Sequence, residues 1–442
     1  MPVRIPGLVG GPSYTRGDNA NMPVKWAPSR REGVFWMRFL HTADWQLGMT
    51  RYFLNGEAQP RYSAARRAAV AALGSLAGEV GAEFVVVAGD VFEHNQLDPR
   101  DVSQSLEAMR GINVPVYLLP GNHDPLDASS VYTSALFTAE RPDNVIVLDR
   151  PGVHEVRPGL QLVAAPWSSK APTTDLVGEV VGGLDRFDDR DDRAEGDDRD
   201  VLDSLDAAPA DGLTRIVVGH GAVDILVPDR DRESLIRLTA IESAIARGAV
   251  HYVALGDKHS RMSVGSTGRI WYSGSPEVTN YDDIEPDPGQ VLVVDIDESD
   301  PLRPVQVDAR RIGRWRFASL RHAVDNGRDI ADLDINLDLM PDKECTVVRL
   351  GLTGSLTITD RAALDACLDR HERLFAALVP WDKQTDIAVM PADGEFDDLG
   401  IGGFAAAAVD ELVATARSTG EDADDASAAL ALLLRLAEGG AA

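Results

Sequence analysis

Short apolar runs alternate with helical stretches between Met37 and about Asp124. The apolar runs are RFLHTA, EFVVVAGD and VPVYLLPGNHD, and the stretches between them are YSAARRAAVAALGSLAGEV and DVSQSLEAMR. This order predicts a βαβαβ unit. Further strands are expected near NVIVLD, LQLVAAP, TRIVVGH, HYVALGD, RIWYSGS and QVLVVDID.

Polar residues fall just past the carboxyl ends of the first three predicted strands. These residues are HTADWQ, GD and GNHD. Open α/β sheets bind their ligands at this end, where segments that are far apart in sequence converge. The pattern therefore predicts a functional site at the strand ends.

The rest of the chain shows other patterns. Residues 1–36 have no sustained period and are rich in Gly, Pro, Ser and Arg, which predicts a disordered leader or, with Met37 as the true start, a mis-called start. The acidic stretch from Asp185 to Asp206 indicates a solvated loop running into a surface helix. We expect one domain over 37–300, a smaller α+β domain over 301–395 and a helical segment over 396–442.

The last predicted helix, ASAALALLLRLAE, is apolar over much of its circumference. Its residues Leu430, Leu433, Leu434 and Ala437 share one face, whereas Leu432 and Leu436 lie on another. A solitary surface helix has a narrower apolar stripe. The helix is therefore expected to pack either on the protein's own core or on a partner or second copy, and the pattern favours neither.

Length and composition narrow the class of protein. A chain of 442 residues exceeds the size of one hydrophobic core, which predicts two domains or one large domain with an appendage. No apolar run has the length of a membrane span, and the first forty residues lack the apolar stretch of a secretory signal. The cysteines, Cys345 and Cys367, show no metal-ligand spacing along the sequence. A cytoplasmic protein that does not bind membranes is expected.

The chain is strongly acidic. Its formal net charge of -28 argues against broad electrostatic attraction to DNA or to an anionic membrane. Any binding of nucleic acid is therefore expected to be local. Compositional drift towards Asp and Arg is the alternative explanation of the charge, and we give it most of the weight.

Five short motifs carry candidate chemistry. In order they are Asp44-x-Gln46, Gly89-Asp90, Gly121-Asn122-His123-Asp124, Gly219-His220 and Gly256-Asp257-x-His259. Each motif alone is modest evidence, because a turn glycine or a capping aspartate would explain it. Four of the five directly follow an apolar strand, and the series in this order is strong evidence for one shared site.

Through HTADWQLG, VVVAGDVFEHN, LLPGNHD, VVGHG and VALGDKH, the chain resembles the calcineurin-like metallophosphoesterases, and specifically the SbcD-like and YhaO-like DNA-repair exonucleases. The resemblance covers Arg38 to about Asp295. It implies an α/β fold, a four-layer sandwich of two mixed β-sheets flanked by helices, with a smaller α+β capping domain and C-terminal helices. It also implies two divalent metal ions, with manganese as the expected ion.

The same resemblance implies a role for each motif residue. Asp90 would bridge two metal ions. Asp44 and His259 would bind the first ion, and the second would be bound by Asn122, His220 and Asp257. His123 has the family position for orienting the phosphate or protonating the leaving oxygen, and Asp124 would hold that imidazole in place.

Two residues depart from the family pattern. Gln46 stands where the usual D-x-H motif has a histidine, and Asp257 stands where the usual G-H-x-H motif has its first histidine. Gln46 can offer an amide oxygen or a water-mediated contact, and Asp257 can still bind a metal. A third carboxylate makes the site less positive, so it should hold cations firmly yet acidify its water less.

Neighbouring polar residues have simpler explanations. Trp45 is expected to pack beneath the metal loop, and His41 to be a buried histidine with satisfied hydrogen bonds. His94 and Asn95 fit a loop turn as well as they fit a substrate contact.

Three functional hypotheses follow. The first is a DNA nuclease, exonuclease or endonuclease in DNA repair. The resemblance implies an SMC-like (SbcC-like) ATPase partner, for which the apolar C-terminal helices are candidate docking elements. The chain has no P-loop motif of its own, so an ATPase would come from another chain. The second is a phosphatase or phosphodiesterase acting on a small molecule, which would suit the acidic charge. The third is a non-catalytic subunit of a DNA-repair complex, suggested by Gln46 and Asp257.

Overall fold

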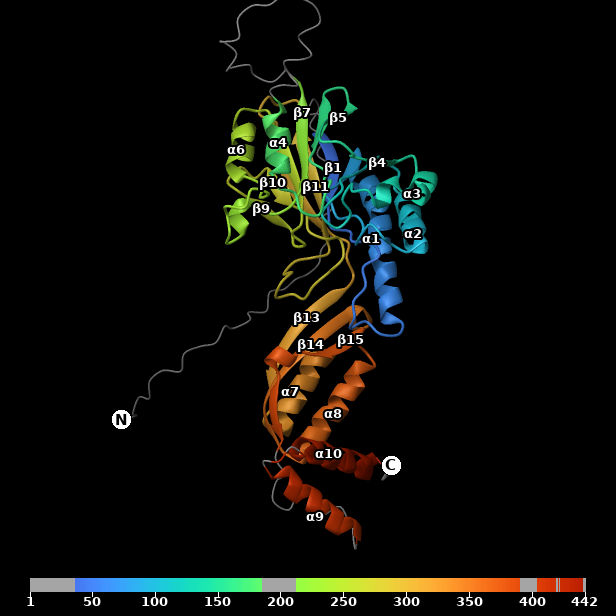
Figure 1. Ribbon diagram of the computed structural model, residues 1–442, viewed down its shortest axis with the longest axis vertical. Helices are drawn as coiled ribbons and strands as arrows, with labels where there is room; N and C mark the ends of the chain where they lie inside the picture. The colour runs from blue at the N-terminus through green and yellow to red at the C-terminus, as the bar shows by residue number, and fades with distance from the viewer. Residues whose placement is uncertain (1–35, 185–211, 390–403, 419, 421, 440–442) are drawn as a thin grey trace, which may run out of the picture. The chain divides into compact units, whose positions relative to one another are not determined.

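A computed structural model describes residues 36–184, 212–389, 404–418, 420 and 422–439. The predictions for residues 1–35 and for most of the acidic stretch at 185–206 lie outside these residues. Two six-stranded sheets form the larger part of the structure, and a third sheet follows them in the chain (Figure 1).

The first sheet contains the predicted βαβαβ unit. Its strand order is β12-β11-β1-β2-β3-β4, in which β1 to β4 run parallel and β11 and β12 join antiparallel. The strands are β1 (Trp36–Thr42), β2 (Phe84–Val87), β3 (Val116–Leu118), β4 (Val145–Val147), β11 (Gln290–Asp297) and β12 (Val305–Arg311). Helices α1 (Ala58–Val80), α2 (Pro99–Arg110) and α3 (Ala135–Glu140) pack on one face of this sheet.

The second sheet has the order β5-β6-β7-β8-β10-β9, with β6, β7, β8 and β10 parallel. The strands are β5 (Gly152–Arg157), β6 (Leu160–Ala164), β7 (Thr214–His220), β8 (Tyr252–Gly256), β9 (Met262–Val264) and β10 (Ile270–Tyr272). Helices α4 (Leu176–Gly182) and α6 (Leu238–Ala246) cover its outer face.

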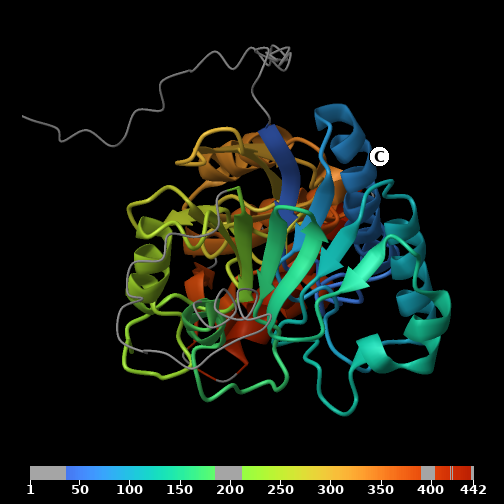
Figure 2. The same ribbon diagram turned by 90° about the horizontal axis from the view of Figure 1, so that it is seen from above.

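The main core lies between these two sheets. Alternate residues of each strand point into it, including Phe39 and Phe84 from the first sheet and Ile216 and Tyr252 from the second. The order of layers is therefore helices, sheet, sheet, helices, and Figure 2 shows α6 and α1 on opposite sides of the strands. The predicted α/β fold, a four-layer sandwich of two mixed sheets flanked by helices, is confirmed.

Local sequence explains where the predicted helices begin and end. Helix α2 begins after Asp98, whose side chain accepts a hydrogen bond from the Arg100 amide, and Pro99 fills its first position. Helix α1 ends at Gly81, which adopts a left-handed conformation with φ of 71°.

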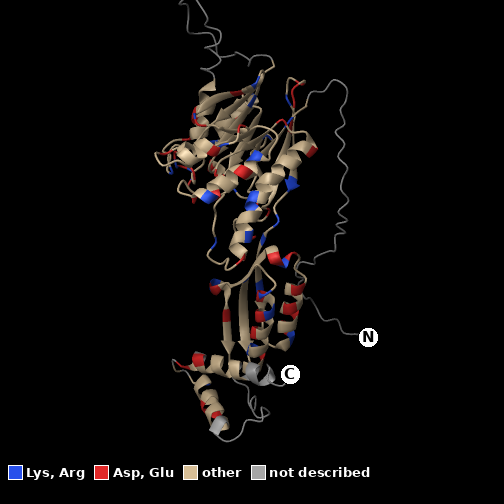
Figure 3. Cartoon of the chain, turned by 90° about the vertical axis from the view of Figure 1, so that its right-hand side faces the viewer, with Lys and Arg blue, Asp and Glu red and all other residues tan. Residues whose placement is uncertain are grey.

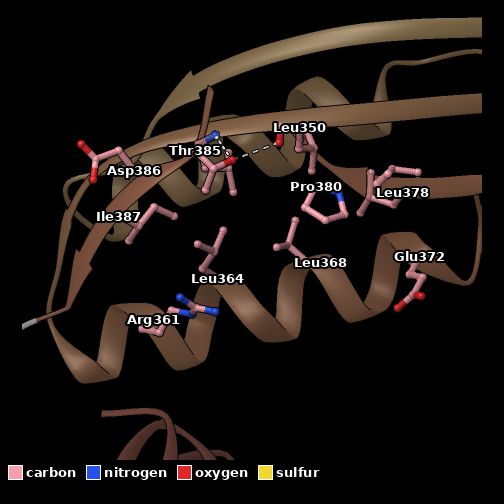
Figure 4. Close-up of a pocket in the computed structure, with 12 residues that line it drawn as sticks. Leu350, Arg361, Leu364, Leu368, Glu372, Leu378, Pro380, Thr385, Asp386 and Ile387 are labelled. Atoms are coloured by element: carbon pink, nitrogen blue, oxygen red, sulfur yellow. Dashed lines mark hydrogen bonds between the residues drawn. The ribbon is translucent and has the colours of Figure 1, made fainter. Parts of the chain in front are cut away.

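A third sheet lies in the C-terminal part of the chain. The parallel strands are β13 (Arg316–Ala323), β14 (Thr346–Leu356), β15 (Ala377–Pro380) and β16 (Asp386–Val389), and α7 (Gly327–Asp338) and α8 (Ile358–Glu372) pack on one face. A cavity of about 680 Å³, lined by aliphatic side chains together with Arg361, Glu372 and Asp386, lies between α8 and strands β14 to β16 (Figure 4). The boundaries proposed at residues 300 and 395 stay a prediction.

Two helices end the described chain, α9 (Phe404–Ala416) and α10 (Ala423–Gly439). Leu430 of α10 is fully buried in a cluster with α8 and α9, and Leu433 packs at its edge, whereas Leu432 is 52% exposed. Part of the apolar surface of α10 is therefore covered by the protein itself. The side chains of Leu434, Leu436 and Ala437 lie outside the described residues.

Acidic and basic positions are interspersed over the described elements (Figure 3). Among the described residues, no helix is both long and apolar enough to cross a membrane.

Candidate metal centre

The predicted site residues come from the carboxyl ends of strands in both sheets. Asp44 and Asp90 follow β1 and β2, and Asn122 follows β3 in the first sheet. His220 ends β7 and Asp257 follows β8 in the second sheet. Because the two sheets pack face to face, these strand ends converge at one edge of the sandwich.

The backbone at this edge is strained. Among the described residues, six other than glycine have a positive φ, and four of them are predicted site residues: Asp44 (53°), Gln46 (42°), Asp90 (53°) and Asp257 (102°). A residue with a Cβ atom adopts this conformation only when its surroundings enforce it, and such strain clusters at functional sites.

The centre of the site is a group of two carboxylates and one imidazole. One ligand atom from each of Asp44, Asp90 and His220 lies within 4.8 Å of the other two, and all three residues are buried. His220 Nε2 is 3.3 Å from Asp90 Oδ2 and 2.8 Å from Asn122 Oδ1. The second imidazole nitrogen, Nδ1, is 2.8 Å from the carbonyl oxygen of Ala88.

The site attracts positive charge. Burial by itself would lower the pKa of His220, but the carboxylates of Asp90 and Asp44 outweigh it and raise the pKa to about 10. Burial raises the pKa of Asp44 to about 6 despite the opposing effect of nearby histidines. Burial also opposes ionisation of Asp90, yet its ion pair with His220 brings the pKa below its ordinary value. A pocket that keeps a buried histidine protonated is suited to a cation.

His259 lies beside this group, and a carboxylate on the far side of its ring fixes its orientation. Its Nε2 is 3.9 Å from Asp44 Oδ1, and its Nδ1 is 2.6 Å from Glu285 Oε1. The Glu285 carboxylate is itself buried and accepts hydrogen bonds from the backbone amides of Thr279 and Asn280. A carboxylate behind an imidazole fixes the ring orientation and increases its basicity, as it does behind metal-binding histidines.

Gln46 supplies a test of whether a metal fits. Its Nε2 is 3.4 Å from His259 Nε2, while its Oε1 is buried without a hydrogen-bond partner in the described chain. A buried acceptor without a partner is unfavourable unless something absent from the protein chain satisfies it. The unpartnered oxygen, two carboxylates and two imidazoles are the donors that divalent metals of intermediate hardness prefer. The residues therefore fit a divalent ion.

Comparison with known proteins places the chain in a family. The profile of the family described as "Calcineurin-like phosphoesterase" matches residues 37–261, a little over half of the chain. The chain belongs to the calcineurin-like phosphoesterases. The expectation of a metallophosphoesterase, a hydrolase that uses divalent metals, is confirmed.

Two relatives resemble this phosphoesterase along part of their length. The chain is 29% identical over 291 residues to the D subunit of the nuclease SbcCD of Rhodobacter capsulatus, an alignment covering 58% of this chain and 66% of that protein. It is 35% identical over 91 residues to the DNA double-strand break repair protein Mre11 of Archaeoglobus fulgidus, covering 20% of this chain and 19% of that one. The matched regions thus span less than two thirds of either relative.

One solved structure with a similar fold is more distant in sequence. The crystal structure of TT1561 of Thermus thermophilus aligns with 63% of this chain and 100% of its own, with 11% identity and a TM-score of 0.35.

The Asn-His loop of this phosphoesterase presents His123 beside Asp90. The backbone amide of His123 donates to Asp90 Oδ1 at 2.9 Å, and its Nδ1 is 2.8 Å from the carbonyl oxygen of Glu93. Its Nε2 is 4.0 Å from Asp90 Oδ2, and the side chain is 37% exposed. Because Nδ1 donates to a carbonyl oxygen, Nε2 is the ring nitrogen that faces Asp90.

Asp124 does not hold the His123 imidazole, which corrects the expectation. Its carboxylate is fully buried and accepts hydrogen bonds from the amides of Phe92 and Gly121 and from the Tyr132 hydroxyl. These partners tie the loop after β3 to the loop after β2. The Glu93 carbonyl oxygen accepts the hydrogen bond from the imidazole instead.

Asp257 contributes its backbone to the centre. Its amide donates to both carboxylate oxygens of Asp44, at 3.1 and 3.2 Å. Its own carboxylate lies 3.3 Å from Lys258 Nζ and is 30% exposed. It is not part of the group formed by Asp44, Asp90 and His220. Its negative charge nevertheless acts on both Asp44 and His220.

Two supporting residues were not predicted. Arg66 of α1 is 2% exposed, and its guanidinium donates to the carbonyl oxygens of Trp45 and Asp44, behind the first ligand loop. The sequence did contain one indication that Arg66 is buried: it lies one helical turn from Tyr62 on the apolar face of α1. Glu285 lies in a segment, TNYDDIEPDP, without a recognisable motif.

The simpler explanations hold for the neighbouring residues. Trp45 is 1% exposed and donates to Thr42 Oγ1, so it packs beneath the loop. His41 is buried with Nδ1 at 3.0 Å from the Tyr252 hydroxyl and Nε2 at 3.2 Å from the Leu255 carbonyl oxygen. Asn95 donates to the carbonyl oxygen of Pro125, and His94 accepts from the Gln96 amide, as expected for a loop turn.

Proposed function

We propose that this phosphoesterase hydrolyses phosphodiester bonds of DNA with two divalent metal ions. The observation that carries the proposal is the convergence of Asp44, Asp90 and His220 within 4.8 Å, flanked by further donors on both sides. The similarity to a nuclease subunit and to a DNA double-strand break repair protein supports DNA as the substrate.

We assign the donors to two halves that share Asp90. Asp44, Gln46 and His259 would hold one ion, and Asn122, His220 and Asp257 the other. Bound divalent ions neutralise charge on the phosphate oxygens and lower the pKa of water. The mixture of carboxylate, amide and imidazole donors suits Mn²⁺. His220, protonated in the metal-free site, would lose its Nε2 proton when it becomes a ligand.

His123 would act on the phosphate from the exposed edge. With Nδ1 held by the Glu93 carbonyl, Nε2 can contact a phosphate oxygen or pass a proton to the leaving oxygen. Asp124, assigned a catalytic role from sequence, would act by fixing the loop that carries Asn122 and His123. It is a positioning residue in this proposal.

The partners follow from the same relatives. One relative is named as a subunit of the nuclease SbcCD, and the other as a DNA repair protein. We propose that an SMC-like ATPase on another chain, or a second copy of this chain, docks on the C-terminal helices. The exposed Leu432 of α10 is available for such contact. The sheet and helices after residue 300 would cap the site and select DNA geometry.

A small-molecule phosphate ester, cleaved by phosphatase or phosphodiesterase activity, is the second candidate substrate. The net charge of -28 favours it, because an acidic protein repels a polyanion more strongly than a small monoanion.

One assay tests these proposals. Linear duplex DNA, single-stranded DNA and p-nitrophenyl phosphate are compared with Mn²⁺ and after chelation. We expect metal-dependent cleavage of DNA that is abolished by Asp90→Asn and strongly reduced by His123→Ala. His154→Ala is the matched control, because His154 lies on β5 and bonds the Arg150 carbonyl oxygen. DNA cleavage by the Asp90→Asn variant would contradict the proposed site. Cleavage of p-nitrophenyl phosphate without cleavage of DNA would contradict the proposed substrate.

A further inference from the structure

A second group of metal-binding side chains lies between α7 and α8, in the C-terminal part of the chain. Cys367 and His371 are four residues apart on α8 and therefore share one face of that helix. Asp334 faces them from α7, which packs against α8 (Figure 1). One ligand atom of each of the three residues lies within 4.8 Å of the other two. Spacing along the sequence does not reveal this group, because Asp334 belongs to another helix.

The Asp334 carboxylate is the centre of the group. Its Oδ1 is 2.6 Å from His371 Nε2 and 3.7 Å from Cys367 Sγ. The same oxygen accepts a hydrogen bond from Arg370, whose side chain is 53% exposed. Three donors thus converge on one carboxylate oxygen, and only the arginine can move into solvent without disturbing the helix packing.

The two residues of α8 are buried. Cys367 is 6% exposed and the His371 side chain is fully buried. His371 Nε2 faces Asp334, whereas Nδ1, on another side of the ring, has no hydrogen-bond partner in the described chain. An imidazole, a thiol and a carboxylate whose donor atoms lie this close together form a set of ligands that zinc accepts.

We propose that Asp334, Cys367 and His371 bind a zinc ion that joins α7 to α8. A thiolate, an imidazole and a carboxylate are the three ligand types of protein zinc sites, and a water molecule would complete the tetrahedron. The Cys367 thiol releases one proton on binding, and the proton of the neutral His371 ring moves from Nε2 to Nδ1 so that Nε2 can bind the metal. The thiolate and the carboxylate together neutralise the charge of Zn²⁺, and the charge of Asp338, one turn along α7, adds attraction at Cys367 and His371.

Cobalt substitution tests this site separately from the phosphoesterase centre. Co²⁺ bound to a thiolate gives an intense near-ultraviolet charge-transfer band, and the proposed phosphoesterase ligands include no cysteine. The full-length protein should therefore show this band at one equivalent per chain, and added Zn²⁺ should remove it. The band should persist in Asp90→Asn, whatever that variant does to hydrolysis.

Variants of the two cysteines identify the ligand. Cys367→Ser and Asp334→Asn should lose the band, whereas the matched control Cys345→Ser should retain it, because Cys345 is outside the group. A native circular dichroism spectrum for Asp334→Asn, whose side chain is 31% exposed, separates loss of binding from loss of folding. Absence of the band from the parent protein, or its loss in Cys345→Ser, would overturn the proposal.

Arg370 offers a gain-of-function test. It competes with the metal for Asp334, so Arg370→Gln should tighten Co²⁺ binding by roughly threefold to fivefold, the effect of removing one exposed ion pair. Arg373→Gln is the control, because Arg373 is exposed on the same helix and bonds a backbone carbonyl oxygen instead. Equal or weaker binding by Arg370→Gln would show that Asp334 is not a ligand.

Discussion

At the scale of single residues, the candidate metal centre depends on glycines next to the ligands as well as on the ligands themselves. A Cβ atom added to Gly89 would lie 2.1 Å from His220 Nδ1, and one added to Gly121 would lie 2.2 Å from Asp90 Oδ1. These glycines let the backbone approach the ligands closely, and at Gly89 a φ of 95° adds a conformational requirement.

Gly89→Ala should therefore disable the centre. The new methyl group would displace the His220 imidazole, and a ligand displaced by about 1 Å lowers activity by roughly 100-fold. Phosphodiesterase assays and metal titration measure the effect. The matched control is Gly78→Ala on α1, where a Cβ would meet nothing within 4 Å and helix propensity predicts a small gain in stability. Full activity in Gly89→Ala would contradict the placement of His220.

Asp257→His restores the family pattern and should make the site more positive. Removing one negative charge near Asp44 and His220 should weaken Mn²⁺ binding but make the attacking water easier to deprotonate. We expect a higher Mn²⁺ concentration for half-maximal rate and an acid limb of the pH–rate profile that moves to lower pH. Asp287→His, whose carboxylate pairs with Arg261 outside the centre, is the control. An unchanged profile would mean that Asp257 does not influence the reaction.

The motif residues could be predicted because each follows a strand in a short, ordered pattern. Glu285 could not be predicted, because its partner His259 lies 26 residues away and no local motif marks the contact. For Arg66, whose partner Trp45 lies 21 residues away, the position on the apolar face of α1 was the one available indication. The role of Asp124 was misjudged for a related reason. Asp124 follows His123 in the sequence and was expected to contact its side chain. The turn after Gly121 instead directs the Asp124 carboxylate back into the core.

At the scale of elements, apolar patterning predicted the strands that form continuous apolar runs and missed β5 and β9, which do not. β7 and β8 are buried at every residue and read as continuous apolar runs. β5 is an edge strand with mostly half-exposed residues, and β9 has three residues, so neither leaves a clear signal. The all-parallel pairing of the third sheet depends on helices α7 and α8 crossing between strands, which short-range patterning does not specify.

His41 on β1 predicts an effect of pH on stability. Burial lowers its pKa to about 3, against an ordinary value of 6.5. The unfolded chain therefore binds a proton below pH 6.5 that the folded chain does not, so the free energy of unfolding falls as pH falls from 6.5 towards 3. Between pH 7 and pH 5 this contribution is about 2 kcal/mol.

Urea unfolding of the chelated protein at pH 7 and pH 5 measures the effect, with His41→Gln as the comparison. The raised pKa values of Asp44 and Asp124 act in the opposite direction in both proteins, so the difference between the two proteins isolates His41. We expect the variant to lose less stability than the parent on acidification. Equal losses would show that His41 is not held neutral in the fold.

At the scale of the whole molecule, the charge sets how a polyanion reaches the site. A net charge of -28 produces a repulsive field that extends about 30 Å at 0.01 M salt and about 10 Å at 0.1 M. A basic nuclease would bind DNA less well as salt rises. For this chain, screening of the repulsion should dominate at low salt, so kcat/KM for DNA should rise between these salt concentrations at constant Mn²⁺.

Bis(p-nitrophenyl) phosphate provides the matched comparison, because it presents one phosphodiester charge to the same centre. Its kcat/KM should change little over the same range of salt, since repulsion between the protein and a monoanion is weak. If kcat/KM rises with salt for DNA alone, salt acts on the association of DNA with the protein and not on the chemical step at Asp90 and His123. A steep fall for DNA would instead reveal several phosphate contacts and a basic path to the site, against the interspersed charges of the described elements.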